Sequence, residues 1–330
     1  MLFDIFMLFL SLALILFSCV LFTNSIEWFG KKLNLSQGVV GSILAAIGTA
    51  MPETIIPIIA IIFYGGGEAG QIATGAILGA PFMLSTLGLF VIGTAVIIYS
   101  LTGKRTLKLN ADKKTFKRDL NFFIIIYIIA IMTTFVNHYN QSRIIATIII
   151  LSLYVLYVIK TFSGEQQMCE NLGSLYCSKL LNVENNMFWI VFQLILSLIG
   201  IIYGAHMFVG YVKDISYTFG IAPLLLSIII TPIATELPEK INSIVWIGQN
   251  KDTLALGNIT GAMVFQSAIP VTIGILFTPW NITGIAFLSA VIALTSAFLN
   301  LAWINSGKKI NPFIFILGGI LYSIFLITIL

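Results

Sequence analysis

Ten long apolar runs occupy most of this 330-residue chain and limit it to a helical membrane fold. A bilayer core about 30 Å thick needs about 20 apolar residues for each crossing helix. Membrane barrel strands are disfavoured because they alternate apolar and polar residues over about ten positions, and these runs do not. We therefore predict an all-α membrane protein with ten transmembrane helices, over residues 3–23, 37–63, 70–99, 120–137, 142–162, 187–211, 221–247, 254–278, 282–304 and 311–330.

The composition excludes several classes of protein. Hydrophobic residues make up 58% of the chain and charged residues only 9%, against roughly 25% charged residues in a soluble domain. A soluble enzyme, a nucleic-acid binder and a secreted disulfide scaffold are therefore excluded. We interpret the three cysteines, Cys19, Cys169 and Cys177, as free thiols. The expected surroundings are the lipid bilayer, and no protein partner is evident.

The basic residues predict the orientation of the chain. Fourteen of the 17 lysines and arginines lie at odd-numbered gaps between the runs, and two lie at even-numbered gaps. Because lysine and arginine are enriched on the cytoplasmic side, we expect both termini to lie outside. The uneven split also supports an even number of spans. The segment Met1–Phe22 has no basic start, so we interpret it as a retained helix rather than a cleaved signal peptide. The cell membrane is the expected location.

The two halves of the chain contain related segments. Residues 49–53 read TAMPE and residues 235–239 read TELPE, while residues 75–85 and 257–267 share Gly, Ile, Gly, Ala and Ser at matching positions. These segments fall in the second and third runs, and again in the seventh and eighth. A five-helix unit places its second copy upside down, as in inverted-repeat transporters. We predict repeats at 1–163 and 187–330, joined by a cytoplasmic linker at 164–186.

Three carboxylates lie deep in the predicted spans: Glu53, Glu236 and Glu239. Burying each of them in a membrane is unfavourable by several kcal/mol, so a cation or protons must offset the charge. Nearby prolines free backbone carbonyls, and hard cations bind such oxygens together with carboxylates. Lys240 is placed to pair with a carboxylate or reach a helix end. A structural role for two such glutamates in corresponding places of a repeat is the weaker interpretation.

Polar residues near the glutamates supply further candidate ligands. Thr49 precedes Glu53 by four positions and Thr235 precedes Glu239 by four, so each pair shares a helix face. Further along each half, polar side chains interrupt apolar runs. The candidate ligands are Glu53, Glu239, Glu236, Thr49, Thr235, Gln266, Ser85 and Ser267.

These motifs resemble those of the cation/calcium exchanger superfamily, whose members carry two inverted repeats with a GTSLPE-like motif and a GNxxGSNI-like motif. Residues 48–53 and 234–239 match the first motif, and residues 75–84 and 257–266 match the second. The resemblance implies that Glu53 and Glu239 coordinate calcium, with Thr49 and Thr235 supplying oxygens. Several serines of the family pattern are replaced here, at Ala50, Glu236, Ala80 and Ala262.

From these features we predict an antiporter that exchanges a cation, with calcium favoured, for Na⁺ or H⁺ by alternating access at a site near the membrane midplane. The missing hydroxyls and the added Glu236 leave proton-coupled or potassium-linked exchange as an alternative. A cation channel is a further alternative and would show flux without a counter-ion. No enzyme motif is found, and no resident cofactor is expected.

Overall fold

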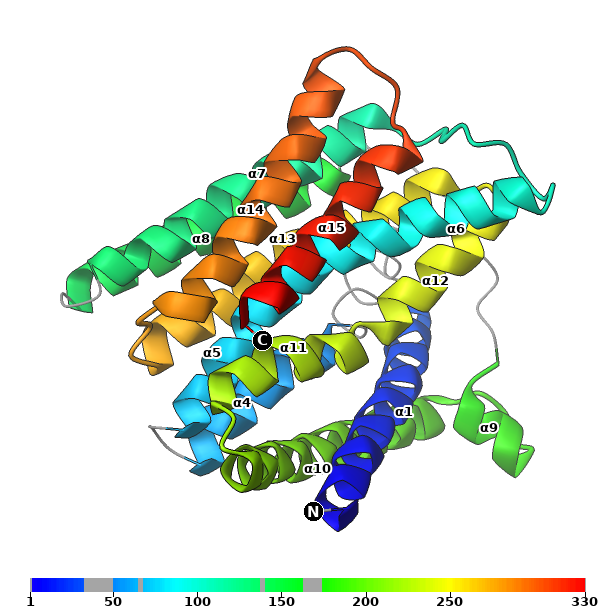
Figure 1. Ribbon diagram of the computed structural model, residues 1–330. Coiled ribbons are helices and arrows are strands. Elements are labelled where there is room, and N and C mark those ends of the chain that lie inside the picture. Colours follow the sequence, from blue (N-terminus) through cyan, green and yellow to red (C-terminus); the bar gives the residue numbers. More distant parts are fainter. Residues whose placement is uncertain (1, 33–49, 65–67, 137–139, 163–173, 330) are drawn as a thin grey trace.

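The computed structural model describes residues 2–32, 50–64, 68–136, 140–162 and 174–329, and within these ranges every regular element is a helix (Figure 1). The elements are α1 (Leu2–Lys32), α4 (Met51–Tyr64), α5 (Glu68–Met83), the π-helix η2 (Leu84–Gly88), α6 (Leu89–Leu101), α7 (Lys113–Met132), the 3₁₀ turn η3 (Thr133–Phe135), α8 (Asn140–Phe162), α9 (Tyr176–Leu181), α10 (Met187–Phe219), α11 (Pro223–Thr235), α12 (Leu237–Gly248), α13 (Asp252–Phe277), α14 (Gly284–Asn305) and α15 (Pro312–Ile329).

Eight stretches of the described chain are long and apolar enough to cross a membrane. They coincide with eight of the ten predicted runs. The other two runs, 37–63 and 221–247, contain the Pro-Glu motifs. Residues 37–49 lie outside the described residues and the rest of that run forms α4, while run 221–247 forms the pair α11 and α12. Large apolar side chains, such as Phe6, Phe17, Ile145 and Ile148, are exposed on the outer helix faces, as a lipid solvent requires. The chain is therefore an integral, multi-pass membrane protein.

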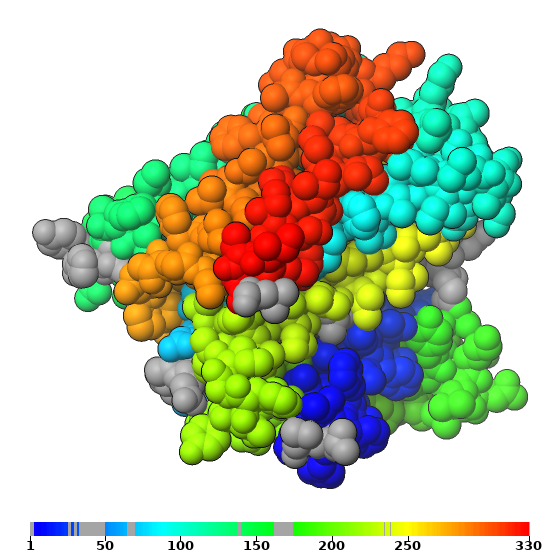
Figure 2. All heavy atoms as spheres, viewed as in Figure 1, coloured from blue at the N-terminus to red at the C-terminus, as the bar shows by residue number. Residues whose placement is uncertain are grey.

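The buried apolar side chains form two separate clusters. One cluster joins α1, α4 and α10 with the first half of α5. The other is larger and joins the second half of α5, η2 and α6 with α7, α8 and α12–α15. Figure 1 shows α1 and α10 lying together on one side of the molecule, while α6, α7, α14 and α15 lie on the other. In the space-filling view α11 lies between these two groups (Figure 2).

The contacts between the halves are reciprocal. The last two helices of the first half, α7 and α8, pack on α13, and the last two of the second half, α14 and α15, pack on α5 and α6 respectively. Helices α1 and α10, which begin the two halves, pack on each other. This arrangement brings the motif helices of both halves to the centre.

Close contact between α5 and α11 depends on two glycines. A Cβ at Gly75 would lie 2.6 Å from the Leu224 carbonyl, and one at Gly79 would lie 2.6 Å from the Ile228 carbonyl. Pro232 has no N–H, so the Ile228 carbonyl lacks its usual helical partner, and it faces the bare backbone of Gly79. The GxxxG spacing of α5 is thus a helix-packing device.

The structure corrects several sequence-based boundaries. The fourth helix begins at Lys113 rather than 120, because Asp112 caps it by accepting hydrogen bonds from the Lys114 and Thr115 amides, both at 3.1 Å. Helix α10 continues to Phe219, eight residues beyond its predicted end. The predicted linker contains a short helix, α9.

Two further acids are buried besides the three glutamates of the predicted spans. Asp119 and Asp252 are also buried, and each is paired with an arginine. Asp252 is the first residue of α13 and Asp119 lies in the second turn of α7, just before the predicted runs 254–278 and 120–137 begin.

Candidate cation site

The two motif glutamates occupy the same position in their helices. Each motif helix begins at the residue before its proline, so that Glu53 is the third residue of α4 and Glu239 is the third residue of α12. Proline is favoured in a first helical turn, where no intrahelical partner for its missing N–H is needed. The positive end of each helix dipole also favours a carboxylate there. Both side chains are 1% exposed.

The second motif breaks its helix at Glu236. This residue lies between Thr235, the last of α11, and Leu237, the first of α12, with φ −90° and ψ 8°. Its carboxylate is fully buried, and its Oε2 lies 3.3 Å from Nζ of Lys240. The prediction that Lys240 pairs with a carboxylate is confirmed.

The carboxylates interact with one another and with neighbouring helices. Glu236 lies within electrostatic range of both Glu53 and Glu239. The ammonium of Lys240 acts on Glu53 as well as on Glu236. From α1, the buried Cys19 lies within range of Glu53 and Glu239. The glutamates of the two halves are therefore brought to one region of the molecule.

Two backbone carbonyls add oxygens to this set. Pro57 lies four residues after Glu53 in α4, and Pro270 lies four residues after Gln266 in α13. Because proline has no N–H, the carbonyls of Glu53 and Gln266 cannot receive the usual helical bond. The proline beside Glu53 is part of the sequence prediction, but the matching role of Pro270 is a signal that the motif comparison misses.

Gln266 is the polar candidate that lacks partners. Its side chain is fully buried, and neither amide atom makes a hydrogen bond to the described residues. A buried amide without partners is unfavourable by roughly 1–3 kcal/mol, which indicates a ligand or water among its natural partners. The carboxyl oxygens of Glu53 likewise accept no hydrogen bond of normal geometry within the described chain.

The hydroxyl candidates are occupied by their own helices. Ser85 donates to the Phe82 carbonyl at 3.1 Å and Ser267 donates to the Val264 carbonyl at 2.9 Å. Thr235 donates to the Thr231 carbonyl at 3.0 Å. Their oxygens can still accept a cation, since a hydroxyl keeps its lone pairs when it donates. The remaining candidate, Thr49, lies outside the described residues.

The π-helix η2 places Ser85 in a distorted turn of the third span. Single π-helical turns occur frequently at functional sites. The carbonyl of Ser85 accepts a hydrogen bond from Ser296 on α14. The sequence analysis predicted this helix but not a role for its polar residues, although Ser289, Ser296 and Asn300 recur at helical spacing in the ninth run and are all buried.

Other polar groups lie near the glutamates. Asn258 on α13 donates to the Glu239 carbonyl at 2.9 Å and to the Ser243 hydroxyl at 3.1 Å, so it fixes α12 to α13. Tyr322 on α15 is buried within electrostatic range of Glu236, and its hydroxyl has no partner among the described residues. Within the described ranges, no three acidic, histidine or cysteine side chains converge closely enough to hold a metal ion in this conformation.

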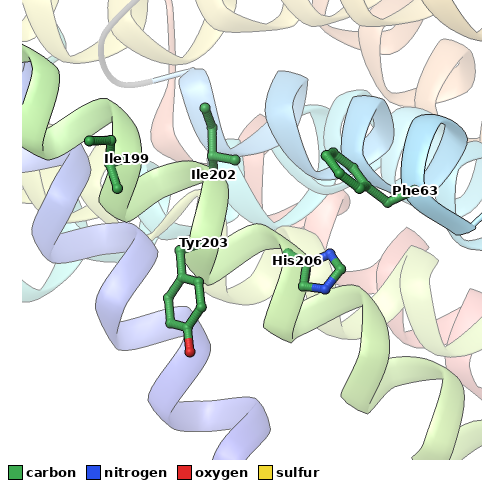
Figure 3. Close-up of a pocket in the computed structure, with 5 residues that line it drawn as sticks. All are labelled: Phe63, Ile199, Ile202, Tyr203 and His206. Atoms are coloured by element: carbon green, nitrogen blue, oxygen red, sulfur yellow. The ribbon is translucent and has the colours of Figure 1, made fainter.

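A separate apolar pocket of about 360 Å³ lies at the far end of α4 (Figure 3). Phe63 lines it from α4, and α10 contributes Ile199, Ile202, Tyr203 and His206. It contains no carboxylate, and Phe63 is ten residues from Glu53, or about 15 Å along a helix. The pocket is therefore not the cation site.

The outer ends of α13 are fixed to the first half of the chain. Arg105 forms a two-point ion pair with Asp252, at 2.8 and 3.0 Å. Asp119 on α7 accepts a hydrogen bond from Thr260 at 2.7 Å. At the other end of α13, Arg143 donates to the carbonyls of Ile275 and Thr278. These contacts fix the position of α13, which carries Gln266, relative to the first half of the chain.

Comparison with known proteins identifies the family. Residues 3–162 and 189–330 match the family described as sodium/calcium exchanger protein. The chain belongs to this family of membrane antiporters, and the resemblance inferred from the motifs is confirmed.

Two curated relatives cover most of the chain. An uncharacterized membrane protein of Methanocaldococcus jannaschii is 25% identical over 282 residues, which are 82% of this chain and 83% of that protein. The inner membrane protein YrbG of Escherichia coli K12 is 22% identical over 309 residues, or 91% and 89% of the two chains.

Two solved structures share the fold. The H⁺/Ca²⁺ exchanger CAX has a TM-score of 0.76 at 16% sequence identity, over 99% of this chain and 81% of that one. A sodium-calcium exchanger, NCX_Mj, soaked with Na⁺ and Sr²⁺, has a TM-score of 0.58 at 21% identity, over 98% and 97% of the two chains.

Proposed function

We propose that this protein exchanges Ca²⁺ for Na⁺ or H⁺ across the cell membrane, at a site built around Glu53 and Glu239. The observation that carries the proposal is the equivalent placement of these two buried carboxylates, each in the first turn of a helix that begins at a Pro-Glu motif. Glu236, Gln266 and the freed carbonyls extend the oxygen set. Thr49, Thr235, Ser85 and Ser267 complete the proposed ligands.

The same proposal includes the topology. Ten passages form two inverted five-helix repeats, at 1–163 and 187–330, with both termini outside and the linker 164–186 in the cytoplasm. The reciprocal packing of the two halves supports this arrangement. In an inverted repeat the site lies near the midplane, between the copies.

Exchange follows from competition for one charged site. Calcium and the counter-ion both need the carboxylates, so they cannot bind together at full occupancy. Each ion stabilises states in which the buried carboxylates are neutralised, and it shifts the populations of the outward-open and inward-open states. The separation of the α1–α10 cluster from the larger apolar cluster supports a movement between two bodies.

The counter-ion is the open part of the proposal. Alanines stand where the family pattern has sodium-ligating hydroxyls, and Glu236 adds a carboxylate, which favours proton coupling. The higher structural similarity to an H⁺/Ca²⁺ exchanger points the same way.

The test is ⁴⁵Ca²⁺ uptake into proteoliposomes, driven in turn by an outward Na⁺ gradient and by a pH gradient. Glu53→Gln and Glu239→Gln are each expected to abolish uptake, whereas Glu184→Gln, on the exposed linker, is expected to leave it unchanged. If both motif variants exchange normally, the site assignment is wrong. Uptake without any counter-ion gradient would instead indicate a channel.

A further inference from the structure

A second pocket, of about 400 Å³, lies beside the ends of membrane-length helices. Its walls come from the α6–α7 connection, the end of α14, the α14–α15 connection and the start of α15, and Figure 1 shows the two connections at the same end of the molecule. Nζ of Lys113, at the start of α7, donates to the Gly307 carbonyl at 3.5 Å, so the two connections lie side by side. Because these helices are long enough to cross a bilayer, the pocket lies at the level of one membrane surface, which the distribution of basic residues predicts to be the cytoplasmic one.

The polar part of this pocket is basic. Lys108, Lys308 and Lys309 line it, and none of the described residues that line it is acidic. All three lysines are exposed. Helix α15 begins here at Pro312, so the positive end of its dipole adds to the charge. Because like charges repel one another, an anion among the lysines would stabilise the two connections that carry them.

The rest of the pocket wall is apolar. Leu107 is 45% exposed and Phe313 is 58% exposed. Trp303 lines the pocket as well, and Nζ of Lys308 lies 4.3 Å from the centre of its ring. A soluble anion such as inorganic phosphate would leave these apolar side chains uncovered. A phospholipid can cover them with an acyl chain while its phosphate contacts the lysines.

Hydrogen bonds hold the backbone around the pocket in place. Nη2 of the buried Arg105 donates to the Lys108 carbonyl at 3.0 Å. Nε1 of Trp303 donates to the Lys309 carbonyl at 2.9 Å. Because a backbone that is already fixed loses less conformational entropy when a ligand binds, these contacts prepare the two connections for binding.

We propose that this pocket binds an anionic phospholipid, whose phosphate lies among Lys108, Lys308 and Lys309 and whose acyl chain covers Leu107 and Phe313. Basic pockets between transmembrane helices are a recurrent type of site for anionic lipid headgroups. The bound lipid joins a connection of the first half of the chain to a connection of the second half. The proposal does not depend on the exchange function proposed above.

Native mass spectrometry of the full chain in detergent tests the proposal, with phosphatidylglycerol and phosphatidylcholine added in equal amounts. The wild type should bind phosphatidylglycerol in preference. Each lysine near an anionic lipid is expected to contribute about fivefold in affinity. The variant Lys108→Gln/Lys308→Gln/Lys309→Gln should therefore bind phosphatidylglycerol on the order of 100-fold more weakly, with no change for phosphatidylcholine.

A matched control removes the same three charges from exposed lysines that do not line the pocket, Lys104→Gln, Lys114→Gln and Lys117→Gln. It should keep the preference for phosphatidylglycerol, because its lysines lie outside the pocket. A further variant, Leu107→Ser/Phe313→Ser, removes the apolar wall and leaves the charges unchanged. It should weaken phosphatidylglycerol binding roughly tenfold, which a site for phosphate alone would not show.

Three results would each overturn the proposal: equal binding of the two lipids by the wild type, equal losses in the two triple-lysine variants, and displacement of phosphatidylglycerol by millimolar inorganic phosphate. Thermal unfolding in detergent checks that the variants fold. If the pocket lysine variant does not fold, the wild type and the Leu107→Ser/Phe313→Ser variant decide. A wild type that prefers phosphatidylglycerol and a variant that loses this lipid support the site, and any other combination refutes it.

Discussion

The ion pair between Arg105 and Asp252 is expected to be a main determinant of stability. Asp252 accepts two hydrogen bonds from the Arg105 guanidinium, at 2.8 and 3.0 Å, and a third from the Asn110 amide at 2.7 Å. Both side chains are almost fully buried. Asp252→Ala would leave the guanidinium buried with only backbone carbonyls as acceptors, including that of Ile247 at 2.8 Å.

Removal of one partner of a buried ion pair typically lowers the free energy of unfolding by about 3–5 kcal/mol. The retained carbonyl contacts of Arg105 place the expected loss within this range rather than above it. A change of 1 kcal/mol shifts the melting temperature of a large domain by about 2–4 °C. The expected fall in Tm for Asp252→Ala is therefore on the order of 10 °C in detergent.

The assay is thermal unfolding followed by intrinsic fluorescence, with a double-mutant cycle. Arg105→Met combined with Asp252→Leu should recover much of the lost stability, because apolar replacements of a buried ion pair are often neutral or stabilising. Thr295→Val, at an exposed position on α14, serves as a control. A fall below 2 °C for Asp252→Ala, or equal losses in the single and double variants, would refute the reasoning.

Two further predictions concern helix contacts. Gly79→Ala should lower the free energy of unfolding by about 1–3 kcal/mol and reduce transport, because the new Cβ would lie 2.6 Å from the Ile228 carbonyl. Thermal unfolding and uptake assays measure the two effects. Gly70→Ala is the control and should show neither effect, because no atom lies within 4 Å of a Cβ at that position. Asp112 has a pKa below its ordinary 3.8, chiefly because the Thr115 hydroxyl donates to it. Its capping contribution, about 1 kcal/mol, should be complete above pH 4 and lost as the pH falls below 3.8, whereas Asp112→Asn should show no such change in acid titrations.

Much of the fold could be predicted from the sequence because the lipid solvent demands long apolar runs. Eight runs correspond to continuous membrane-length stretches. The positions at which helices break were less predictable. Pro232 lies inside α11 without ending it, and the helix ends three residues later, at Thr235. Tertiary contacts, including the packing of α5 against α11, therefore help to decide where a helix that contains proline ends.

The site was predictable where a repeat made it visible. Glu53 and Glu239 stand out because the two motifs match, and the structure places them in equivalent first turns. Ser296 and Tyr322 were not predicted as site residues, because neither belongs to a motif that is repeated in the other half of the chain. Asp119 was missed for another reason: its carboxylate pairs with the adjacent Arg118 and accepts a hydrogen bond from Thr260, which lies in the other half of the chain.

The broken helix has a consequence for biogenesis. Helix α11 has 13 residues and α12 has 12, which correspond to about 20 and 18 Å at 1.5 Å per residue. Neither spans a hydrocarbon core of about 30 Å alone. While the chain is being inserted, these two short helices therefore need a neighbour that is already in the membrane. The Gly75–Gly79 face of α5, which is synthesised about 150 residues earlier, lies against α11, so we expect the first half to serve as the surface on which the second half is completed.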